Sequence, residues 1–369
     1  MAGDEVRVAV VGCGFQGRLH LECLRRIPDA RVVAICDRDV DRLSAAARDF
    51  GIAHAFRDHR ELIEERMIDL LTVCTMPDSH REIAVETLDA GAAVLCEKPM
   101  AANLDAAVAM AEAARRADRP LAVGFNLRFS TAALAARSFI LDGRLGTPVC
   151  ARGSMLETVV PWWGPHHVKA ISGGGAINST AIHMIDLLMW LAGNPRPLTA
   201  TASTARLFPG KRGATVPNES EAKRYDVEDL AFGHVRFEDG FWMTIEGGWT
   251  WDAPGSECRF DLVGDRAQVS AEPLRFWAER SGDCIDITGD ATGDLNFPKS
   301  VARQLADVVS AVRDGRSPTV TAEQALEVQA VVDALYRSAA EGREVSVVQT
   351  RSGALTTAAA GAGAGGGEG

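Results

Sequence analysis

The amino-acid sequence predicts an α/β fold that begins with a doubly wound parallel sheet and continues into a β-rich second region. Strand and helix patterns alternate through residues 1–125, and such alternation is typical of parallel strands joined by helical crossovers. The texture changes near residue 126, and 369 residues are too many for one compact core, so we expect a second domain over 126–350. Residues 351–369, almost wholly Ala and Gly, are expected to be a disordered tail.

The first strand and the loop after it are the most informative stretch. Val6–Val11 is typical of a buried strand, and a G-x-G-x-x-G turn follows it at once and opens a helix over 16–27. Gly12 suits the tight turn, Gly14 the close approach of a pyrophosphate, and Gly17 helix-on-strand packing. The phosphates would lie on the helix N-terminus, where free N–H groups favour anions. The stretch therefore predicts a Rossmann dinucleotide site, with Phe15 and Gln16 of the same loop among the cofactor contacts.

The second strand, over 31–36, ends at Asp37, about 20 residues beyond Gly17, where a ribose-binding carboxylate is expected. A carboxylate there accepts hydrogen bonds from a free ribose 2′-OH and repels a 2′-phosphate. The neighbouring Arg38 could pair with that phosphate, or it could be a solvated residue in a charged run. We expect NAD, with NADP the less favoured cofactor.

The same patterns predict the remaining elements. In the first domain they indicate a helix ending at Phe50 and others over 60–66, 79–90 and 103–117, with strands over 54–56, 68–75, 92–96 and 121–125. In the second domain we expect a strand from 148 towards 160 and β-rich sequence over 198–277, with a hairpin at 238–240 and a turn at 263–265. A mobile loop is expected over 211–224. Helices are expected over 131–141, 179–191, 300–313 and 322–340.

Composition excludes several classes of partner. The net charge is −11 and no basic stripe is present, which argues against nucleic acid. No apolar run approaches the roughly 20 residues that span a bilayer, and the first residues lack the layout of a signal peptide. Eight cysteines without a C-x-x-C pair indicate reduced, buried thiols. We expect a cytoplasmic protein with a small-molecule substrate.

Lys98 is a candidate catalytic residue. It follows a buried strand and precedes a proline, so it should be fixed at the crevice beyond the strand ends, where ligands bind in such sheets. Beside a nicotinamide its pKa could fall, and it could share in proton transfer or polarise a substrate oxygen. The alternative is a surface lysine at a strand end. Thr75, Pro77, His80 and Glu97 fall at the same strand ends.

A second informative stretch runs from Ser172 to Asp186. Its glycines at 173–175 would let a ligand approach the backbone, and a helix follows. Ser179, His183 and Asp186 are spaced i, i+4 and i+7, so they should share one helical face. Histidine is the natural base for an alcohol proton near neutral pH, and a hydrogen-bonded core histidine is the alternative.

Five motifs in order give the chain a family resemblance. They are Gly12-x-Gly14-x-x-Gly17, Thr75-x-Pro77-x-x-His80, Glu97-Lys98-Pro99, Gly124-Phe125-Asn126-x-Arg128-Phe129, and Gly173-Gly174-Gly175 through His183 to Asp186. Over about residues 5 to 350 the chain resembles the Gfo/Idh/MocA family of NAD(P)-dependent sugar and cyclitol oxidoreductases. The resemblance implies a Rossmann domain followed by an α+β domain with a large open, mainly antiparallel sheet. That sheet often forms oligomer contacts, so a homo-oligomer, dimer or tetramer, is implied.

The resemblance also implies roles for site residues. Lys98 and His183 would flank the reacting carbinol, and Asp186 would bind a neighbouring hydroxyl. Asn126 and Arg128 would line the crevice, although Arg128 could instead form a structural salt bridge. The motif positions Thr75, Pro77, His80 and Glu97 would contribute to the cofactor site, and no metal is implied.

One position departs from the family pattern. Where the family commonly has an aspartate four residues before the histidine, this chain has Ser179, which cannot balance an imidazolium. We hypothesise that Lys98 and His183 carry proton transfer while Ser179 orients substrate or histidine. His166 and His167 are adjacent and should point opposite ways on an extended segment, which argues against a shared metal. Trp162 and Trp163 could stack on a sugar ring or pack at the sheet edge, and Trp163 is taken as the substrate contact.

The sequence thus predicts an NAD-dependent oxidoreductase that interconverts a secondary alcohol and a ketone on a sugar, amino sugar, glycoside or cyclitol. Two alternatives stay open. One is a redox-neutral glycosidase that uses bound NAD transiently. The other is a catalytically weak, cofactor-binding regulatory protein.

Overall fold

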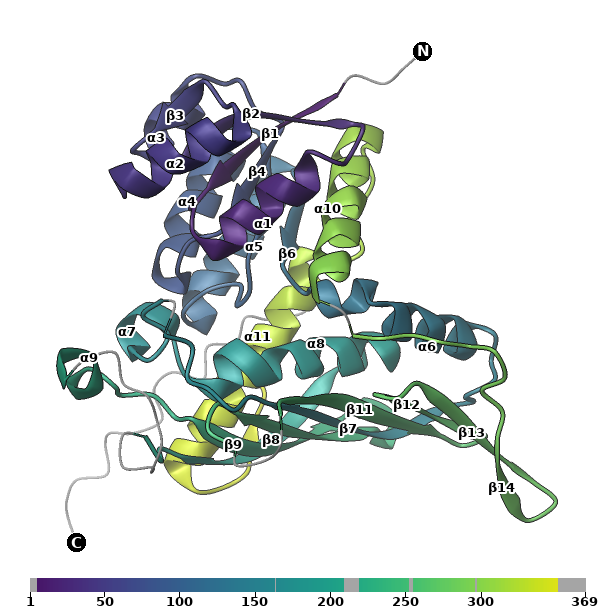
Figure 1. Cartoon of the computed structure of the whole chain (residues 1–369). Coiled ribbons are helices and arrows are strands. Elements are labelled where there is room, and N and C mark those ends of the chain that lie inside the picture. The colour runs from purple at the N-terminus through teal and green to yellow at the C-terminus, as the bar shows by residue number, and fades with distance from the viewer. Residues whose placement is uncertain (1–4, 163, 209–218, 252–254, 296, 351–369) are drawn as a thin grey trace, which may run out of the picture.

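The computed structural model describes residues 5–162, 164–208, 219–251, 255–295 and 297–350. Its first part is a six-stranded parallel sheet with the strand order β3-β2-β1-β4-β5-β6 (Figure 1). This is the order of a doubly wound dinucleotide-binding sheet, so the predicted fold class is confirmed. The strands are β1 (Val6–Val11), β2 (Ala30–Cys36), β3 (His54–Phe56), β4 (Leu70–Val73), β5 (Ala93–Cys96) and β6 (Leu121–Val123).

Helices cover both faces of this sheet, and its central strands are therefore apolar throughout. Every residue of β4 and β5 is buried. The side chains of Asp39, Asp58 and Asn103 accept backbone N–H groups and so fix where α2, α3 and α5 begin. The helices are α1 (Phe15–Leu24), α2 (Val40–Phe50), α3 (His59–Glu64), α4 (Pro77–Asp89) and α5 (Leu104–Ala117).

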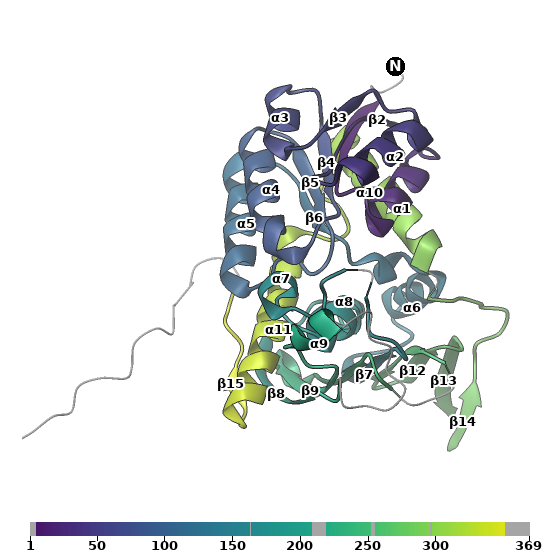
Figure 2. The same ribbon diagram turned by 60° about the vertical axis from the view of Figure 1, so that its left-hand side comes forward.

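The second part is a nine-stranded sheet with the order β14-β13-β12-β11-β7-β10-β9-β8-β15. The pair β7 and β10 is parallel and the other pairs are antiparallel, which confirms a large, mainly antiparallel sheet. Helices lie on the face turned towards the first sheet, and the opposite face is open (Figures 1 and 2). The strands are β7 (Pro148–Leu156), β8 (Pro197–Ala205), β9 (Leu230–Phe237), β10 (Trp242–Gly248), β11 (Glu257–Gly264), β12 (Ala267–Ala271), β13 (Arg275–Arg280), β14 (Asp283–Asp286) and β15 (Val345–Ser346).

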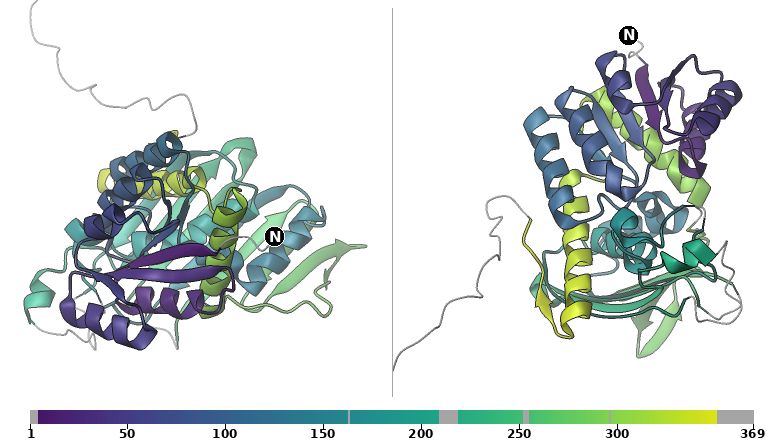
Figure 3. Two further views of the ribbon diagram at one scale, coloured as in Figure 1. Left: turned by 90° about the horizontal axis from the view of Figure 1, so that it is seen from above. Right: turned by 90° about the vertical axis from the view of Figure 1, so that its left-hand side faces the viewer.

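The helices of the second part join the two sheets. They are α6 (Thr131–Leu141), α7 (Lys169–Ser172), α8 (Ile182–Leu191), α9 (Glu219–Lys223), α10 (Phe297–Asp314) and α11 (Ala322–Glu341). All residues of α8 are buried between the sheets. Helix α10 returns to the first sheet, where Val301 and Leu305 share one apolar cluster with Val8, Val10 and Leu21 (Figure 3). The second stretch of chain therefore completes the core of the first, a contact that the predicted division at residue 125 does not anticipate.

Several details differ from the expectations. A π-turn, η2 (Ile177–Ala181), precedes α8 where one α-helix was expected. A short 3₁₀ turn, η1 (Asn126–Phe129), links β6 to α6, and another, η3 (Glu238–Gly240), makes the expected hairpin turn between β9 and β10. The end of the expected mobile loop forms α9, while residues 209–218 and the tail at 351–369 lie outside the described residues. Among the helices described, none is both long and apolar enough to cross a bilayer.

Candidate active site

The glycine loop after β1 has the shape that a dinucleotide needs. Gly12 has φ +92°, and a Cβ there would lie 2.5 Å from the carbonyl oxygen of Cys74. A Cβ on Gly17 would overlap the carbonyl oxygen of Gly12, so helix α1 packs directly on the turn. By contrast, a Cβ on Gly14 would meet no atom within 4 Å. The start of α1 has no side-chain cap and no acidic residue, and Phe15 is 71% exposed. Open space at a helix N-terminus fits a pyrophosphate.

Asp37 lies at the end of β2 with a fixed carboxylate. Its Oδ2 accepts the backbone N–H of Cys13 at 2.7 Å, and its Oδ1 accepts that of Asp39 at 2.8 Å. The carboxylate is therefore anchored to the glycine loop itself, with lone pairs left for a ribose hydroxyl. Arg38 is exposed beside it. The residues present fit an adenine dinucleotide with a free 2′-OH.

The motif from Thr75 to His80 links two strand ends. Pro77 begins α4, and the hydroxyl of Ser79 donates to Thr75 Oγ1 at 2.8 Å. The fully buried His80 places Nε2 3.1 Å from the carbonyl of Thr75 and Nδ1 3.0 Å from the carbonyl of Pro99. His80 therefore holds the β4 loop against the turn that carries Lys98, and both ring nitrogens face protein atoms.

Lys98 lies between the two sheets, next to a cis peptide bond with Pro99. Its Nζ donates to the main-chain carbonyl of Ser179, in the π-turn, at 2.6 Å. Burial lowers the pKa of Lys98, and the carboxylates of Glu97 and Glu157 act against this lowering. The structure thus brings Lys98, from the end of β5, together with the entrance of helix α8.

His183, on the first turn of α8, is buried in the neighbourhood of Lys98. Burial and the positive charge of Lys98 hold the pKa of His183 well below its ordinary value, and its Nδ1 has no hydrogen-bond partner among the described residues. Burial, together with the charges of Lys98 and His167, also lowers the pKa of His166 to about 4. A neutral imidazole beside an ammonium group can accept the proton of an alcohol.

Ser179 contributes its backbone to this group, and its side chain points elsewhere. The indole Nε1 of Trp249, which follows β10, donates to Thr180 Oγ1 at 2.8 Å and to Ser179 Oγ at 3.0 Å. The two hydroxyls are also 3.0 Å apart. The hydroxyl of Ser179 therefore has neighbours other than His183, and its hypothesised role in orienting substrate or histidine stays a prediction.

Arg128 and Asp186 form a buried ion pair. Arg128 Nε lies 2.9 Å from Asp186 Oδ2 and its Nη2 lies 2.5 Å from Oδ1, and neither side chain is exposed. The guanidinium also donates to Gln324 Oε1 at 2.6 Å. This geometry favours the salt-bridge alternative for Arg128. The expected substrate contact of Asp186 needs correction, because Arg128 engages both of its carboxylate oxygens.

Asn126 is likewise turned away from the crevice. It is buried, and its amide donates to Ser300 Oγ of α10 at 2.7 Å. The expected crevice role of Asn126 is therefore replaced by a contact between the two parts of the chain.

Two family models match the chain. One, described as "Oxidoreductase family, NAD-binding Rossmann fold", covers residues 6–125, and the other, described as "Oxidoreductase family, C-terminal alpha/beta domain", covers residues 137–347. The chain belongs to the Gfo/Idh/MocA oxidoreductase family. It is accordingly an NAD-binding oxidoreductase, as the glycine loop and Asp37 indicate.

Named relatives span nearly the whole chain. D-apiose dehydrogenase of Paraburkholderia graminis is 29% identical over 368 residues, which cover 96% of this chain and 93% of that protein. Inositol 2-dehydrogenase 2 of Saccharopolyspora erythraea is 29% identical over 348 residues, covering 93% and 95%. An oxidoreductase domain protein from Kribbella flavida has the same fold, with a TM-score of 0.83 at 25% identity over 94% of this chain and 100% of that one.

The glycines that open the second family motif serve packing within the protein. A Cβ on Gly173, Gly174 or Gly175 would overlap the backbone of Ala102, the hydroxyl of Tyr336 or the backbone of Glu228, in that order. The expectation that they let a ligand approach is therefore wrong. Glu228 instead accepts the N–H groups of Gly175 at 3.0 Å and Ile177 at 2.9 Å, and so fixes the entrance of the helix that carries His183.

Of the two tryptophans before α7, the structure describes Trp162. Trp162 packs against Phe208 and His167, with ring centroids 5.3 and 4.9 Å apart, so it belongs to an apolar cluster. Trp163, the expected sugar-stacking residue, lies outside the described residues. His167 Nε2 lies 2.8 Å from Glu221 Oε2. The two histidines lie in a turn and not on an extended segment, so the expected opposite directions of the two rings stay a prediction.

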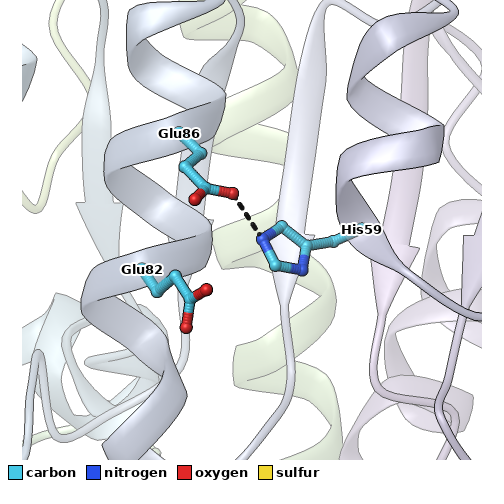
Figure 4. A group of neighbouring side chains, drawn as sticks. All are labelled: His59, Glu82 and Glu86. Atoms are coloured by element: carbon cyan, nitrogen blue, oxygen red, sulfur yellow. Dashed lines mark hydrogen bonds and ion pairs between the residues drawn. The ribbon is translucent and has the colours of Figure 1, made fainter.

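Within the described residues, one group of three side chains has the spacing of metal ligands, namely His59, Glu82 and Glu86 on α3 and α4 (Figure 4). It lies on the surface of the first domain. His59 Nε2 is 2.8 Å from Glu86, and Arg60 pairs with both glutamates. Because Arg60 already balances the charge of the two glutamates, this cluster does not support a metal site.

No motif in the sequence predicts the place of four residues in this region, namely His20, Glu157, His166 and Trp249. His166 was considered only as a metal ligand. His20 lies four residues after Gln16 on α1, a spacing that places both on one face and could have drawn attention to it.

Proposed function

We propose that this oxidoreductase oxidises a secondary alcohol of a sugar, amino sugar, glycoside or cyclitol, with NAD as the cofactor. The observation that carries the proposal is the group formed by Lys98, His183 and the Ser179 carbonyl beyond the ends of the parallel strands. The glycine loop and Asp37 would hold NAD, which would supply the hydride acceptor for the carbinol carbon. The named relatives that act on apiose and inositol support a polyhydroxylated substrate.

The residues of the chain supply the proton chemistry. The ammonium of Lys98 would donate a hydrogen bond to the carbinol oxygen and stabilise negative charge as it develops there. His183 stays neutral because of burial and the charge of Lys98, so it would accept the hydroxyl proton. Burial of both groups between the sheets excludes water and strengthens their electrostatic effect.

The charges of the site favour a neutral or amino-bearing substrate. Of the two cations predicted at the crevice, Arg128 is paired with Asp186 and only Lys98 remains for the substrate. The nearby carboxylate of Glu157 makes the surroundings of Lys98 less favourable to an anion. A phosphorylated sugar would lack a second positive partner within this set of residues.

The test is NADH formation with a panel of inositols, hexoses, apiose, amino sugars, glycosides and a hexose phosphate. We expect a signal with at least one neutral or amino-bearing compound and none with the phosphate. Lys98→Met should abolish it while NAD binding, followed by fluorescence, is retained. The matched control is Lys169→Met, an exposed lysine on α7. Turnover by Lys98→Met at the wild-type rate would refute the assignment, and product formation without net NADH would favour the glycosidase alternative.

We also propose that the protein is a homo-oligomer assembled through the open face of the second sheet. Phe232 and Trp242 are 43% and 38% exposed on this face, and the Trp242 ring stacks on His234 at 5.6 Å. Large exposed aromatics on a sheet face are typical of interfaces. Light scattering should give a multiple of 39.3 kDa, which Trp242→Glu should reduce. A wild-type monomer would refute this assembly.

A cytoplasmic location is proposed on the state of the cysteines. All eight are free in the structure, and four of them, all in the first sheet domain, are buried. Thiol titration of the unreduced, denatured protein isolated from its native cells should find eight reactive groups, whereas a disulfide would argue for an oxidising compartment.

A further inference from the structure

We propose that Glu97, held by His20 and Gln16, is a positioning residue that keeps the Lys98 side chain charged and directed at the Ser179 carbonyl. The proposal deepens the proposed function, because it assumes that Lys98 acts as an ammonium group. It rests on a buried cluster at the ends of β4, β5 and β6 that the proton chemistry described above does not use.

The carboxylate of Glu97 is enclosed by donors. Its Oε1 accepts the side-chain amide of Gln16 at 2.8 Å and lies 3.0 Å from Nε2 of His20. Its Oε2 accepts the backbone N–H of Lys98 at 3.2 Å. Glu97 is 9% exposed and His20 is 1% exposed, so this pair is shielded from water. A buried carboxylate with three donors is stabilised in its charged form.

The backbone at Gly124 lies so close to the Glu97 carboxylate that a side chain at position 124 would not fit. A Cβ on Gly124, at the end of β6, would lie 2.8 Å from Glu97 Oε2 and 3.1 Å from Oε1. Gly124 does not have a positive φ, so its conformation does not require glycine. Glycine is required at position 124 because the Glu97 carboxylate packs directly against the main chain there. Glu97 therefore has one position, defined by α1 on one side and β6 on the other.

The charged groups around Glu97 and Lys98 explain how Glu97 affects the pKa of Lys98. Lys98 faces Glu97 from its own strand end, Glu157 after β7, His183 on α8 and His166 before α7. The neighbours of Glu97 are His20 and Gln16 on α1 and Lys98. The thiol of Cys74 contacts His20 on its other side, with Sγ 3.4 Å from Nδ1. Burial acts to raise the pKa of Glu97, but His20, Lys98 and Gln16 together lower it. Glu97 is thus an anion beside a lysine whose pKa is lowered by burial, and its charge acts against that lowering.

The first test reads the charge of Lys98 without substrate. The full-length protein is reductively methylated with ¹³C, which keeps lysines cationic, and the lysine resonances are titrated by NMR. The chain has few lysines (Lys98, Lys169, Lys211, Lys223 and Lys299), and the Lys98 signal is assigned by its loss in Lys98→Arg. We expect Glu97→Gln to move the Lys98 midpoint to lower pH and Glu97→Asp to move it less.

Two further variants make the result specific. Gly124→Ala keeps every charge but displaces the carboxylate, so it should also lower the Lys98 midpoint. Glu86→Gln removes a glutamate paired with a histidine at 2.8 Å on the domain surface, and it should leave the midpoint unchanged (Figure 4). A Lys98 midpoint that is the same in wild type, Glu97→Gln and Gly124→Ala would overturn the proposal.

The second test uses turnover once a substrate is known. Glu97→Gln should lower kcat by about tenfold to a hundredfold, the cost of a misplaced catalytic group, with the KM for NAD within about twofold of wild type. An unchanged kcat would overturn the proposal. If the substrate panel stays silent, the titration still decides the role of Glu97, so failure of the dehydrogenase assignment and failure of this inference remain distinguishable.

Discussion

The Nζ of Lys98 donates to the main-chain carbonyl oxygen of Ser179 at 2.6 Å, while the hydroxyl of Ser179 is held by the indole of Trp249 at 3.0 Å. Lys98 therefore depends on the backbone path of the π-turn and not on the side chain at position 179. At this position, where the resemblance led us to expect an aspartate, Ser179 takes part through its carbonyl.

Substitution of the Ser179 side chain should consequently have a small effect. We expect Ser179→Ala to change kcat by no more than about threefold, because the carbonyl remains, whereas Lys98→Met should cost about 10²- to 10⁴-fold. Steady-state NADH formation measures both. A hundredfold or larger loss of kcat in Ser179→Ala would show that the hydroxyl takes part in catalysis, as first hypothesised.

The pH dependence of turnover should lack a titration of His183 near its ordinary pKa. Burial and Lys98 hold the pKa of His183 well below 6.5, so the imidazole is neutral at pH 6 and above. We expect kcat/KM to show no rise centred on pH 6.5, and His183→Gln to lower kcat by about 10²- to 10⁴-fold. His54→Gln, at an exposed position, is the control. A rise at pH 6.5 that disappears in His183→Gln would contradict this expectation.

Asp37 should set the preference for NAD. Removal of a charged hydrogen-bond acceptor costs about 1.5–3 kcal/mol, so Asp37→Ala should raise the KM for NAD by roughly tenfold or more and narrow the advantage over NADP. Asp41→Ala, an exposed acid four residues further on, is the control. Initial rates measured with NAD and with NADP test this prediction. If the ratio of the two rates is the same in Asp37→Ala as in wild type, Asp37 does not bind the ribose.

The Arg128–Asp186 pair should act on stability. Asp186→Asn leaves a buried guanidinium without its anion, which costs about 3–5 kcal/mol. Urea denaturation should show this loss, and the double variant Arg128→Met with Asp186→Leu should recover part of it. If Asp186→Asn instead kept full stability and raised the KM for substrate, Asp186 would be a substrate contact after all.

His20 should make stability depend on alkaline pH. Burial acts to lower its pKa, but Cys74 and Glu97 outweigh burial and raise it to about 10, compared with 6.5 in the unfolded chain. The folded state therefore holds one more proton between these values. Its stabilising effect is complete below pH 6.5 and is lost as the pH rises to about 10, at up to roughly 1.4 kcal/mol per pH unit. Urea denaturation at pH 7 and 9.5 should show a steeper fall for wild type than for His20→Gln, and equal slopes would contradict the assignment.

Features set by local sequence could be predicted from the chain alone. Val6–Val11 and the three glycines after it specify a strand, a turn and a helix through backbone geometry, and the structure has each of them in place. The same holds for the hairpin around Asp239, where a turn sequence separates two apolar runs. The parallel arrangement of the first sheet followed from the alternation of strands and helices, whereas its strand order came only from the structure.

The contacts that define the site could not be read in this way, because their partners are distant in sequence. Trp249 lies 70 residues from Ser179, and Gln324 lies 196 residues from Arg128. The spacing of His183 and Asp186 places them on one helical face, but spacing alone does not show that Arg128 already engages the Asp186 carboxylate. The glycines at 173–175 were ambiguous for the same reason, since only the fold brings Tyr336 and Glu228 against them.

The late position of helix α10 in the chain delays completion of the first sheet's core during synthesis. The apolar flank of the first sheet, including Val8 and Leu21, is covered by Val301, Leu305 and Val308, which are made long after that sheet. At 5–20 residues per second a ribosome needs on the order of 10–40 s for the roughly 190 residues between the end of β6 and the end of α10. During that interval the nascent sheet carries an uncovered apolar strip. A chaperone that shields such strips, or slow release of the chain, would therefore bear on yield more than any residue of the active site.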